Sequence, residues 1–567
     1  MDIVDIVVLI GLLVAISFFG LFTALHGTKQ TSAAQILHGS NVSVLTSALS
    51  VCSGFLSAIS LLGFPAEVHY QGAMIFWYGP MYMVAFPIAA YCFLPVFYNM
   101  KLTSIYEYLE IRFNFACRFL ASVTFCIQTW LYVSVTLYAP ALALSTIISI
   151  PLSVSIVLTA GLAALYVTLG GAKASIYTSA LQMALILASM MLIFSVSLYH
   201  FGFNNVLKTA VAGGRLQLLD FRIDPRIRHS VWSLMIGGTG NILCLFAANQ
   251  LTIQRYMAMS SLRSAQWVVL LNIPFNFLIL TTYVGAGLII YHKYFHCNPA
   301  LQSNDQLFPR FVIDELSVIP GMVGLFAASV YSAGLSTASA SYSALAAVFI
   351  EDVVKQFQTK VQKREPLKPN TSILLARYLP LLFCFLSMVI AYLCSLMKTM
   401  VLQVSLSIFG IAGGPVLSVF CLGMFFPKIK GLAAFIAQVA STVFCVFIAA
   451  GALVNQVKPV ALPIDETCGQ SNVTLTFAEK PEYGMVHPLQ SNVWLIQLFR
   501  LSYQYYSISA LLVAFVVAHI VQWFSGSVEH LPVEARLLSP LLRPTHNLKK
   551  TILDYPSGTR KDGEIPL

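Results

Sequence analysis

Long apolar stretches separated by short polar segments make up most of the chain. A helix needs about 20 apolar residues to cross the hydrocarbon core of a bilayer, and thirteen stretches have a suitable length and composition. The pattern therefore predicts an all-α integral membrane protein with about 13 transmembrane helices. The stretches lie at 4–25, 44–66, 72–97, 119–147, 152–169, 175–199, 230–251, 266–291, 318–350, 372–396, 400–426, 431–451 and 503–524.

Two of the predicted helices, 44–66 and 230–251, are interrupted by glycine, proline and polar residues. The first contains the run Ser53–Pro65 and the second contains Ile236-Gly-Gly-Thr-Gly-Asn241. Such breaks free backbone groups, which a membrane tolerates only where protein, water or a ligand satisfies them. The two helices are five spans apart, and interrupted helices in matching halves are typical of inverted-repeat transporters with a midplane site. We therefore predict a 5+5 core at 41–430, although glycines at close helix crossings remain an alternative.

The distribution of charge predicts the orientation of the helices. Only 10% of the residues are charged, against about 25% in soluble domains. Most of the 32 Lys and Arg residues fall in alternate connecting segments, which the positive-inside rule assigns to the cytoplasm. The N-terminus is then extracellular and the C-terminus cytoplasmic. The net charge of +10 follows from this topology and indicates no nucleic-acid partner.

The connecting segments complete the predicted organisation. The extracellular loop at 452–502 contains Asn472 in an N-glycosylation sequon. Cys297 and Cys468 both fall outside, where they can pair as a disulfide. The predicted parts are an extracellular N-terminus with the first helix and an inner loop (1–40), the ten-helix core (41–430), two additional helices with the glycosylated loop (431–524) and a cytoplasmic tail (525–567).

The interior offers hydroxyl oxygens and almost no charge. The run Tyr331–Leu345 carries six Ser and Thr hydroxyls, which suit a hard cation such as Na⁺, or else allow close helix packing. The only ionisable side chains predicted within spans are Arg377 and His519, so proton coupling through a buried acid is disfavoured. HExxH, GxSxG and a complete P-loop are missing, so no enzyme is indicated. A secondary transporter remains, or a channel or receptor on the same scaffold.

Six stretches, in order along the chain, resemble the sodium:solute symporter family. The resemblance is to the branch of sodium-coupled monocarboxylate, multivitamin and iodide transporters, and it implies a LeuT-like fold in the plasma membrane. The matching stretches are Phe55–Glu67, Leu102–Asn114, Leu169–Ala174, Asn249–Tyr256, Ser336–Ser339 with Glu351–Asp352, and Gly410–Pro415.

The resemblance also implies binding residues at matching positions. A Na⁺ site would use main-chain carbonyls of Ser53, Leu56 and Ala333 and the hydroxyls of Ser336 and Thr337. Substrate would lie near Phe55, Ser60, Tyr82, Phe246, Asn249 and Gln403. Helix packing is an equally good explanation of each aromatic residue, and a helix-end network holding Arg255 is an alternative for Asn249. The implied ligands are Na⁺ as co-transported ion and a small-molecule substrate, with no further cofactor.

This chain departs from the family pattern beside the predicted ion site. Ser179 stands where relatives usually carry an aspartate, Ser343 replaces an asparagine, and Ser60 replaces a glutamine. Two functions remain open. Either the protein is a sodium-coupled symporter of a small organic anion such as a monocarboxylate, or it is an uncoupled transporter or a non-transporting sensor on the same scaffold. Lactate-like acids, short fatty acids, vitamins and halides all fit this branch.

Overall fold

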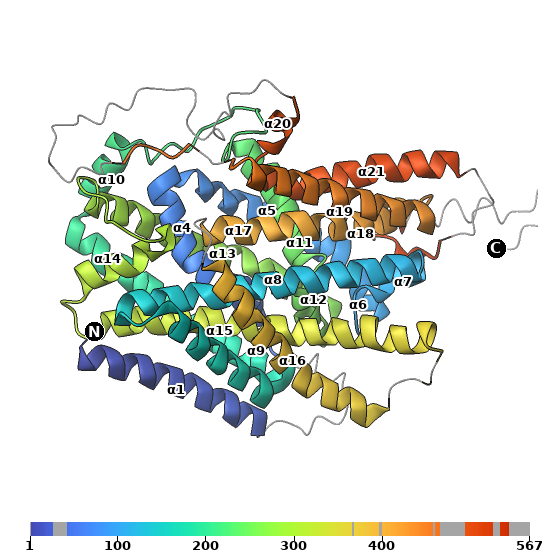
Figure 1. Cartoon of the computed structure of the whole chain (residues 1–567), viewed down its shortest axis with the longest axis horizontal. Coiled ribbons are helices and arrows are strands. Elements are labelled where there is room, and N and C mark those ends of the chain that lie inside the picture. The colour runs from blue at the N-terminus through green and yellow to red at the C-terminus, as the bar shows by residue number, and fades with distance from the viewer. Residues whose placement is uncertain are drawn as a thin grey trace, which may run out of the picture.

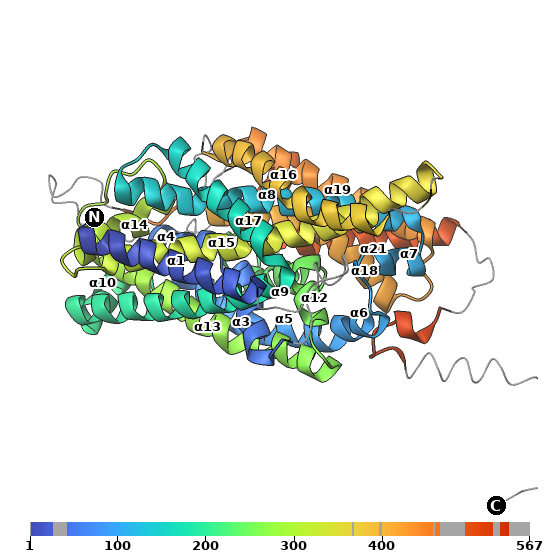
Figure 2. The ribbon, with the colours of Figure 1, turned by 90° about the horizontal axis from the view of Figure 1, so that it is seen from below.

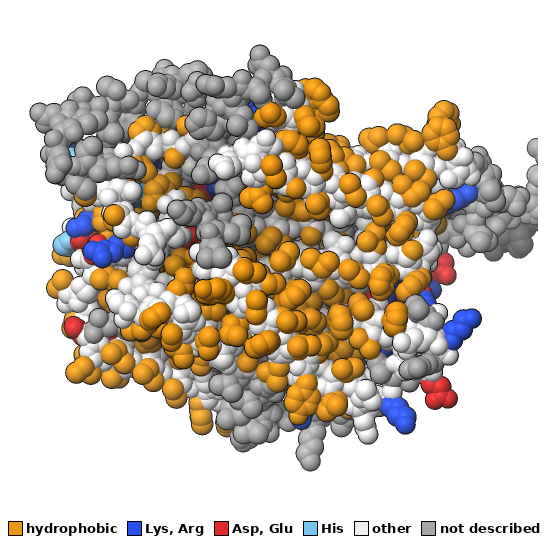
Figure 3. All heavy atoms as spheres, in the orientation of Figure 1, with side chains coloured by type: hydrophobic (Ala, Val, Ile, Leu, Met, Phe, Trp, Pro, Cys, Tyr) orange, Lys and Arg blue, Asp and Glu red, His pale blue; other side chains and the backbone are white. Residues whose placement is uncertain are grey.

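The computed structural model describes residues 2–25, 42–363, 365, 368–395, 400–457, 460–464, 494–525 and 533–543. All regular elements in these segments are helical, and the long helices run side by side along the longest axis of the molecule (Figures 1 and 2). On the face in Figure 3, hydrophobic side chains cover the middle, while charged side chains gather at the two ends. This distribution fits a bundle that crosses a bilayer along its long axis.

The helices of the core fall into two sets, each opened by a broken helix. The first set comprises α3 (Val44–Phe55), α4 (Ala58–Gln71), α5 (Tyr78–Ile88), α6 (Leu94–Met100), α7 (Glu107–Arg112), α8 (Phe115–Ile148) and α9 (Leu152–Phe201). After α10 (Phe203–Ala212), the second set comprises α11 (Gly238–Phe246), α12 (Gln250–Met257), α13 (Leu262–Lys293), α14 (Leu307–Leu316), α15 (Met322–Val348), α16 (Pro369–Cys394), α17 (Val401–Ile408) and α18 (Gly414–Phe425). Outside these sets lie α1 (Ile3–Leu25), α19 (Gly431–Val454), α20 (Trp494–Phe499) and α21 (Tyr506–Phe524).

The number of spans is slightly lower than the sequence predicts. Ten helices in the described segments are long and apolar enough to cross a membrane, or up to 12 if each bent pair counts as one span. The difference lies in α9, a continuous helix of 50 residues that covers two predicted spans. Its part Ser175–Phe201 qualifies as a span, whereas Leu152–Ala164 is a shorter apolar helix.

The breaks of both interrupted helices lie at polar caps rather than at the glycine runs. The axes of α3 and α4 differ by 60°, and the Ser57 side chain accepts a hydrogen bond from the Ile59 N–H to cap α4. The second break, of 57°, precedes α12, which Asn249 caps in the same way. Capping satisfies backbone donors that a helix N-terminus leaves open, so each break is stabilised within the protein.

The glycine run at 236–241 is helical and serves close packing. It forms a π-helical turn, Ser233–Gly237, that continues into α11. A Cβ at Gly237 would lie 2.5 Å from the carbonyl oxygen of Gln504, and one at Gly240 would lie 2.6 Å from Ser507 Oγ. The predicted location of this break is therefore wrong, and the alternative of glycines at a close helix crossing holds here.

Helix α15 lies at the centre of the bundle. In the membrane-spanning segment that contains α15, 89% of the most apolar stretch is buried inside the protein. The corresponding share is 22% for the segments that contain α1 and α21. Helices α1, α8 and α9 pack against α15. Except for the partly buried Ser343, the residues of the hydroxyl-rich stretch are buried, so their polar groups need partners within the protein.

Candidate functional site

Four of the five predicted ion ligands meet where the end of α3 touches the middle of α15. Ser53 Oγ donates a hydrogen bond to Ser336 Oγ (2.7 Å). Thr337 Oγ1 donates to the carbonyl oxygens of Ser53 (3.3 Å) and Ala333 (3.1 Å). All four residues are buried. Leu56, the fifth, follows α3 directly, and its N–H donates to the Cys52 carbonyl.

The oxygens at this junction are neutral hydroxyls and main-chain carbonyls. Such ligands suit a hard monovalent cation, whereas transition metals prefer imidazole or thiolate. Among the described residues, no group of His, Cys, Asp or Glu could hold a metal ion. A cation that entered would break the hydrogen bonds between these oxygens, and the hydroxyl groups would turn their oxygens toward the ion and their hydrogens away from it. The chemistry of the junction therefore fits Na⁺.

Helix α9 supports this junction with hydroxyls instead of a carboxylate. Ser175 Oγ lies 3.3 Å from Ser339 Oγ, and Ser339 Oγ in turn donates to the Ser336 carbonyl (3.1 Å). Ser179 is fully buried, and its Oγ has no hydrogen-bond partner among the described residues. No negative charge from α9 therefore offsets a bound cation.

The predicted substrate residues are only partly brought together. Tyr82 on α5 and Phe246 on α11 both contact Phe86, with ring centroids 5.6 and 4.7 Å apart respectively. They form one aromatic wall in which all three rings are buried. Ser60 is buried on α4, and the side chain of Phe55 lies outside the described part of the structure.

Asn249 and Gln403 are engaged in contacts within the protein. Asn249 Oδ1 accepts the Leu251 N–H (2.9 Å) at the start of α12 and so caps that helix. Among the described residues no hydrogen bond joins it to Arg255, so the network expected to hold Arg255 is not formed. Gln403 Oε1 accepts a hydrogen bond from Arg228 Nη1 (2.8 Å). Gln403 thus belongs to a charged group that the sequence did not indicate.

A buried ion pair contradicts the expectation of an acid-free interior. Glu67 on α4 is fully buried, and its two carboxylate oxygens accept from Arg228 Nε (2.7 Å) and Nη2 (2.9 Å). The expectation failed because the predicted span ended at residue 66, whereas α4 continues to Gln71. Both oxygens are occupied by a guanidinium, so this carboxylate is arranged as a structural anchor and not as a proton relay.

A second buried pair lies toward the opposite end of the core. Asp352, which follows α15, accepts from Arg118 Nε (2.8 Å) and Ser122 Oγ (3.0 Å) on α8. Ser104 Oγ also donates to this carboxylate. Neither of these two carboxylates forms a hydrogen bond with Ser53, Ser336 or Thr337 at the junction of α3 and α15.

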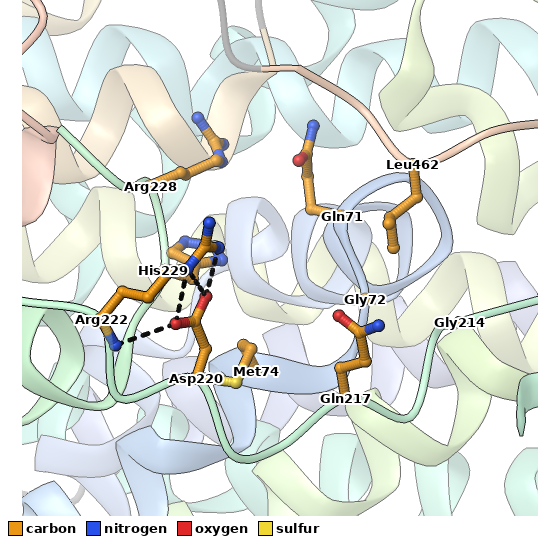
Figure 4. A pocket seen from close by; sticks show the side chains of 10 residues that line it. All are labelled: Gln71, Gly72, Met74, Gly214, Gln217, Asp220, Arg222, Arg228, His229 and Leu462. Carbon is orange, nitrogen blue, oxygen red and sulfur yellow. Dashed lines mark hydrogen bonds and ion pairs between the residues drawn. The ribbon is translucent and has the colours of Figure 1, made fainter. Parts of the chain in front are cut away.

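Arg228 and His229 help to line a small pocket (Figure 4). Its volume is about 40 Å³, so it has room for a few water molecules and not for an organic substrate. Arg222 forms an ion pair with Asp220 (2.6 Å) at its wall. Burial lowers the pKa of His229 to about 4, an effect that Glu67 opposes and Arg228 strengthens, so His229 is neutral at pH 7. The lining residues are Gln71, Gly72, Met74, Gly214, Gln217, Asp220, Arg222, Arg228, His229 and Leu462.

The cysteines outside the predicted extracellular loops are not cross-linked. Cys297 is disulfide-bonded, whereas its predicted partner Cys468 and the sequon at Asn472 lie outside the described residues. The other nine described cysteines are free, and five of them are buried.

Comparison with known proteins gives one consistent result. The sodium:solute symporter family matches residues 35–441. The sodium-coupled monocarboxylate transporter 2 of Mus musculus is 34% identical over 547 residues, which cover 95% of this chain and 86% of that protein. Sodium-coupled monocarboxylate transporter 1 of Homo sapiens is 33% identical over 539 residues, covering 92% and 87%. A putative sodium-dependent multivitamin transporter of Drosophila melanogaster is 32% identical over 525 residues, covering 92% and 86%.

A solved structure confirms the fold. The substrate-bound outward-open state of a Na⁺-coupled sialic acid symporter superposes with a TM-score of 0.76 at 21% identity. The match covers 94% of this chain and 100% of the other. The likeness establishes the LeuT-like arrangement of the helices.

Proposed function

Because this chain belongs to the sodium:solute symporter family and is a multi-pass sodium-coupled transporter rather than an enzyme, we propose that its cargo is a small organic anion of the monocarboxylate class. Relatives named as monocarboxylate transporters align with more than nine-tenths of the chain. The aromatic wall of Tyr82, Phe86 and Phe246 suits the short apolar part of such an acid.

The observation that carries the proposal is the junction of Ser53, Ser336 and Thr337. It joins a broken helix to the most buried helix of the bundle. Na⁺ bound there by the carbonyls of Ser53, Leu56 and Ala333 and the two hydroxyls would hold α3 against α15. Such an ion drives transport only if it binds one of the two access states more tightly than the other. We assign Na⁺ to the outward-facing state, from which ion and anion move inward together.

The substrate side of the proposal uses the buried residues near the breaks. Phe55, Ser60, Tyr82 and Phe246 would surround the anion, and Asn249 would position the start of α12 beside it. Gln403 would act at the outer end, where it bonds to Arg228. We also propose an extracellular N-terminus, a cytoplasmic tail, glycosylation at Asn472 and a bond between Cys297 and Cys468.

Uptake of a radiolabelled monocarboxylate such as lactate, with Na⁺ or with choline in its place, tests the function. We expect Ser336→Ala combined with Thr337→Ala to raise the Na⁺ concentration for half-maximal uptake by about tenfold or more, which corresponds to about 1.4 kcal/mol or more, because the double variant removes two of the five oxygens proposed to coordinate the ion. Ser329→Ala is the matched control, because that buried hydroxyl on α15 bonds only to the Leu325 carbonyl of its own helix. Unchanged Na⁺ dependence in the double variant would refute the site.

Ser179 favours one alternative, transport without sodium coupling. Its Oγ is buried without a hydrogen-bond partner among the described residues, and a hydroxyl dipole attracts a cation less strongly than a carboxylate charge does. Equal lactate uptake in Na⁺ and in choline would support this alternative. Surface-expressed protein with no uptake of any small anion would support a non-transporting sensor.

A further inference from the structure

Arg255, on α12, is a buried cation without an acceptor in the described part of the chain. The residue is only 4% exposed. Among the described residues, its Nη1 has no hydrogen-bond partner and no ion pair involves its guanidinium. An uncompensated charge inside a protein costs several kcal/mol. This cost would be removed if a group outside the described fold paired with the guanidinium.

The other buried arginines show what this chain normally provides. Arg228 is held by Glu67, and Arg118 by Asp352 and Glu110. Arg112, which is partly buried, donates to four main-chain carbonyls at the end of α18 and just beyond it. Two more buried arginines also have acceptors: Arg215 donates to the main-chain carbonyls of His69 and Gly213, and Arg500 donates to Gln497 Oε1. Arg255 differs from these arginines because the described residues offer its Nη1 no acceptor.

The surroundings of α12 contain no acid that could serve as the missing partner. The helices α3, α6, α11, α13 and α15 pack against it, and none of them contains Asp or Glu. Figures 1 and 2 both show α12 beside α6. The segment 26–41, outside the described residues, also has no Asp or Glu in its sequence. A negative partner must therefore be a ligand or a more distant part of the chain.

The guanidinium lies next to the proposed transport site. A Cβ at Gly54 would overlap with Arg255 Nη1, so the charged group rests against the backbone where α3 ends, one residue from Ser53. Arg255 is six residues beyond Asn249 along the helix, which corresponds to about 9 Å. The position is on the predicted cytoplasmic side of both breaks. An anion that leaves the central site inward would pass this group.

We propose that Arg255 binds the carboxylate of the transported anion on the cytoplasmic side of the central site, as the last contact before release. This inference rests on the proposed function, because it assigns a second position to the same cargo. A guanidinium presents two parallel N–H donors that match a carboxylate, and burial strengthens the interaction. An anion at this position gives the buried charge the partner that the fold lacks. A neutral analogue of the same shape lacks that charge and binds weakly.

The first experiment uses wild-type protein, so it does not depend on whether a variant folds. Purified transporter in Na⁺-free buffer, which favours the inward-facing state, is treated with phenylglyoxal, and modification of Arg255 is read by mass spectrometry. We expect modification without ligand, protection by lactate and no protection by the neutral analogue lactamide. Equal modification with and without lactate overturns the proposal, and so does a complete absence of modification in the Na⁺-free state.

The second experiment measures transport from the cytoplasmic side. In proteoliposomes, the half-saturating lactate concentration for exchange is measured separately at the outer and inner faces. We expect Arg255→Gln to raise the inner value roughly tenfold or more and to change the outer value little, with partial recovery in Arg255→Lys. Arg263→Gln, at an exposed arginine on the same predicted side, is the matched control. Equal inner values in Arg255→Gln and wild type overturn the proposal.

Two further outcomes separate the possible causes. The C-terminal residues 544–567 include the acids Asp554, Asp562 and Glu564. If deletion of these residues makes Arg255 reactive toward phenylglyoxal and lactate no longer protects it, the tail is the partner of Arg255 and the inference is wrong. If wild type shows no lactate uptake in any ionic condition, the proposed function itself fails, whereas normal uptake with an unaffected Arg255→Gln removes only this inference.

Discussion

The buried pair of Glu67 and Arg228 leads to a quantitative prediction about stability. Glu67→Gln removes the negative partner of a guanidinium whose side chain is only 3% exposed. Two charge-assisted hydrogen bonds of 2.7 and 2.9 Å are lost or become neutral contacts. Each is worth about 1.5–3 kcal/mol, and breaking a buried pair by removing one partner costs about 3–5 kcal/mol. We expect a loss of about 3–5 kcal/mol.

Thermal unfolding of the purified protein in detergent measures this loss. A fluorophore that reacts with thiols reports unfolding directly, because five of the nine free described cysteines are buried in the folded state. We expect a clearly lower unfolding temperature for Glu67→Gln than for wild type. Glu534→Gln is the control, because its carboxylate pairs with Arg536 on the surface, with side chains 60% and 65% exposed. Exposed pairs contribute little.

Removal of both charges separates a broken pair from a general loss of packing. Replacing a buried ion pair with apolar residues of similar volume is often neutral or stabilising. Glu67→Leu combined with Arg228→Met should therefore recover most of the unfolding temperature that Glu67→Gln loses. If Glu67→Gln unfolds at the wild-type temperature, or if the double variant is less stable than either single variant, the reasoning is refuted.

Two further predictions concern packing and pH. Gly237→Ala should lower the unfolding temperature, because its Cβ would lie 2.5 Å from the Gln504 carbonyl; Gly161→Ala, with open space around it, should not. Burial raises the pKa of Asp305, which lies outside the spans, to about 7, against opposing hydrogen bonds from Val401 and Ser303. The folded state therefore favours the protonated acid, and the associated stability is present at low pH and lost as the pH rises through about 7. Unfolding temperatures on either side of pH 7 should differ less in Asp305→Asn than in wild type; an equal difference would contradict this assignment.

The fold was predictable from the sequence because a bilayer leaves few options for the backbone. Long apolar stretches indicated the helices, and two interrupted stretches indicated the halves of the core. The residues at which the two helices break were harder to predict from the sequence. The glycine run at 236–241 looked like the weak point, yet a helix tolerates its glycines when they allow a neighbouring segment to come close. The break depends on Asn249, whose capping role is set by the local backbone conformation.

The candidate site was predictable where it depends on hydroxyls within one central helix. The hydroxyl-rich stretch stood out by composition, and the family resemblance implied Ser336 and Thr337 within it. The structure places both residues against Ser53. The roles of Glu67 and Arg228 were not predictable, because a span end drawn one residue early made the acid look like part of a loop. Their contact joins residues 161 positions apart, and periodicity along the chain carries no information about such a pair. The interaction of Gln403 with Arg228 was hidden for the same reason.

The contacts of Arg228 with Glu67 and with Gln403 differ in strength, and this difference indicates which helix can separate from its neighbours most easily. Its two bonds to Glu67 are charge-assisted and join the outer end of α4 to the segment before α11. Its bond to Gln403 on α17 has a neutral acceptor, so this contact lacks the attraction between opposite charges that strengthens the contact with Glu67. A movement that separates α17 from the two broken helices therefore breaks the weaker contact and keeps the ion pair. The arrangement holds α4 and the start of the second half together as one unit, while α17 remains the element that can move away at low cost.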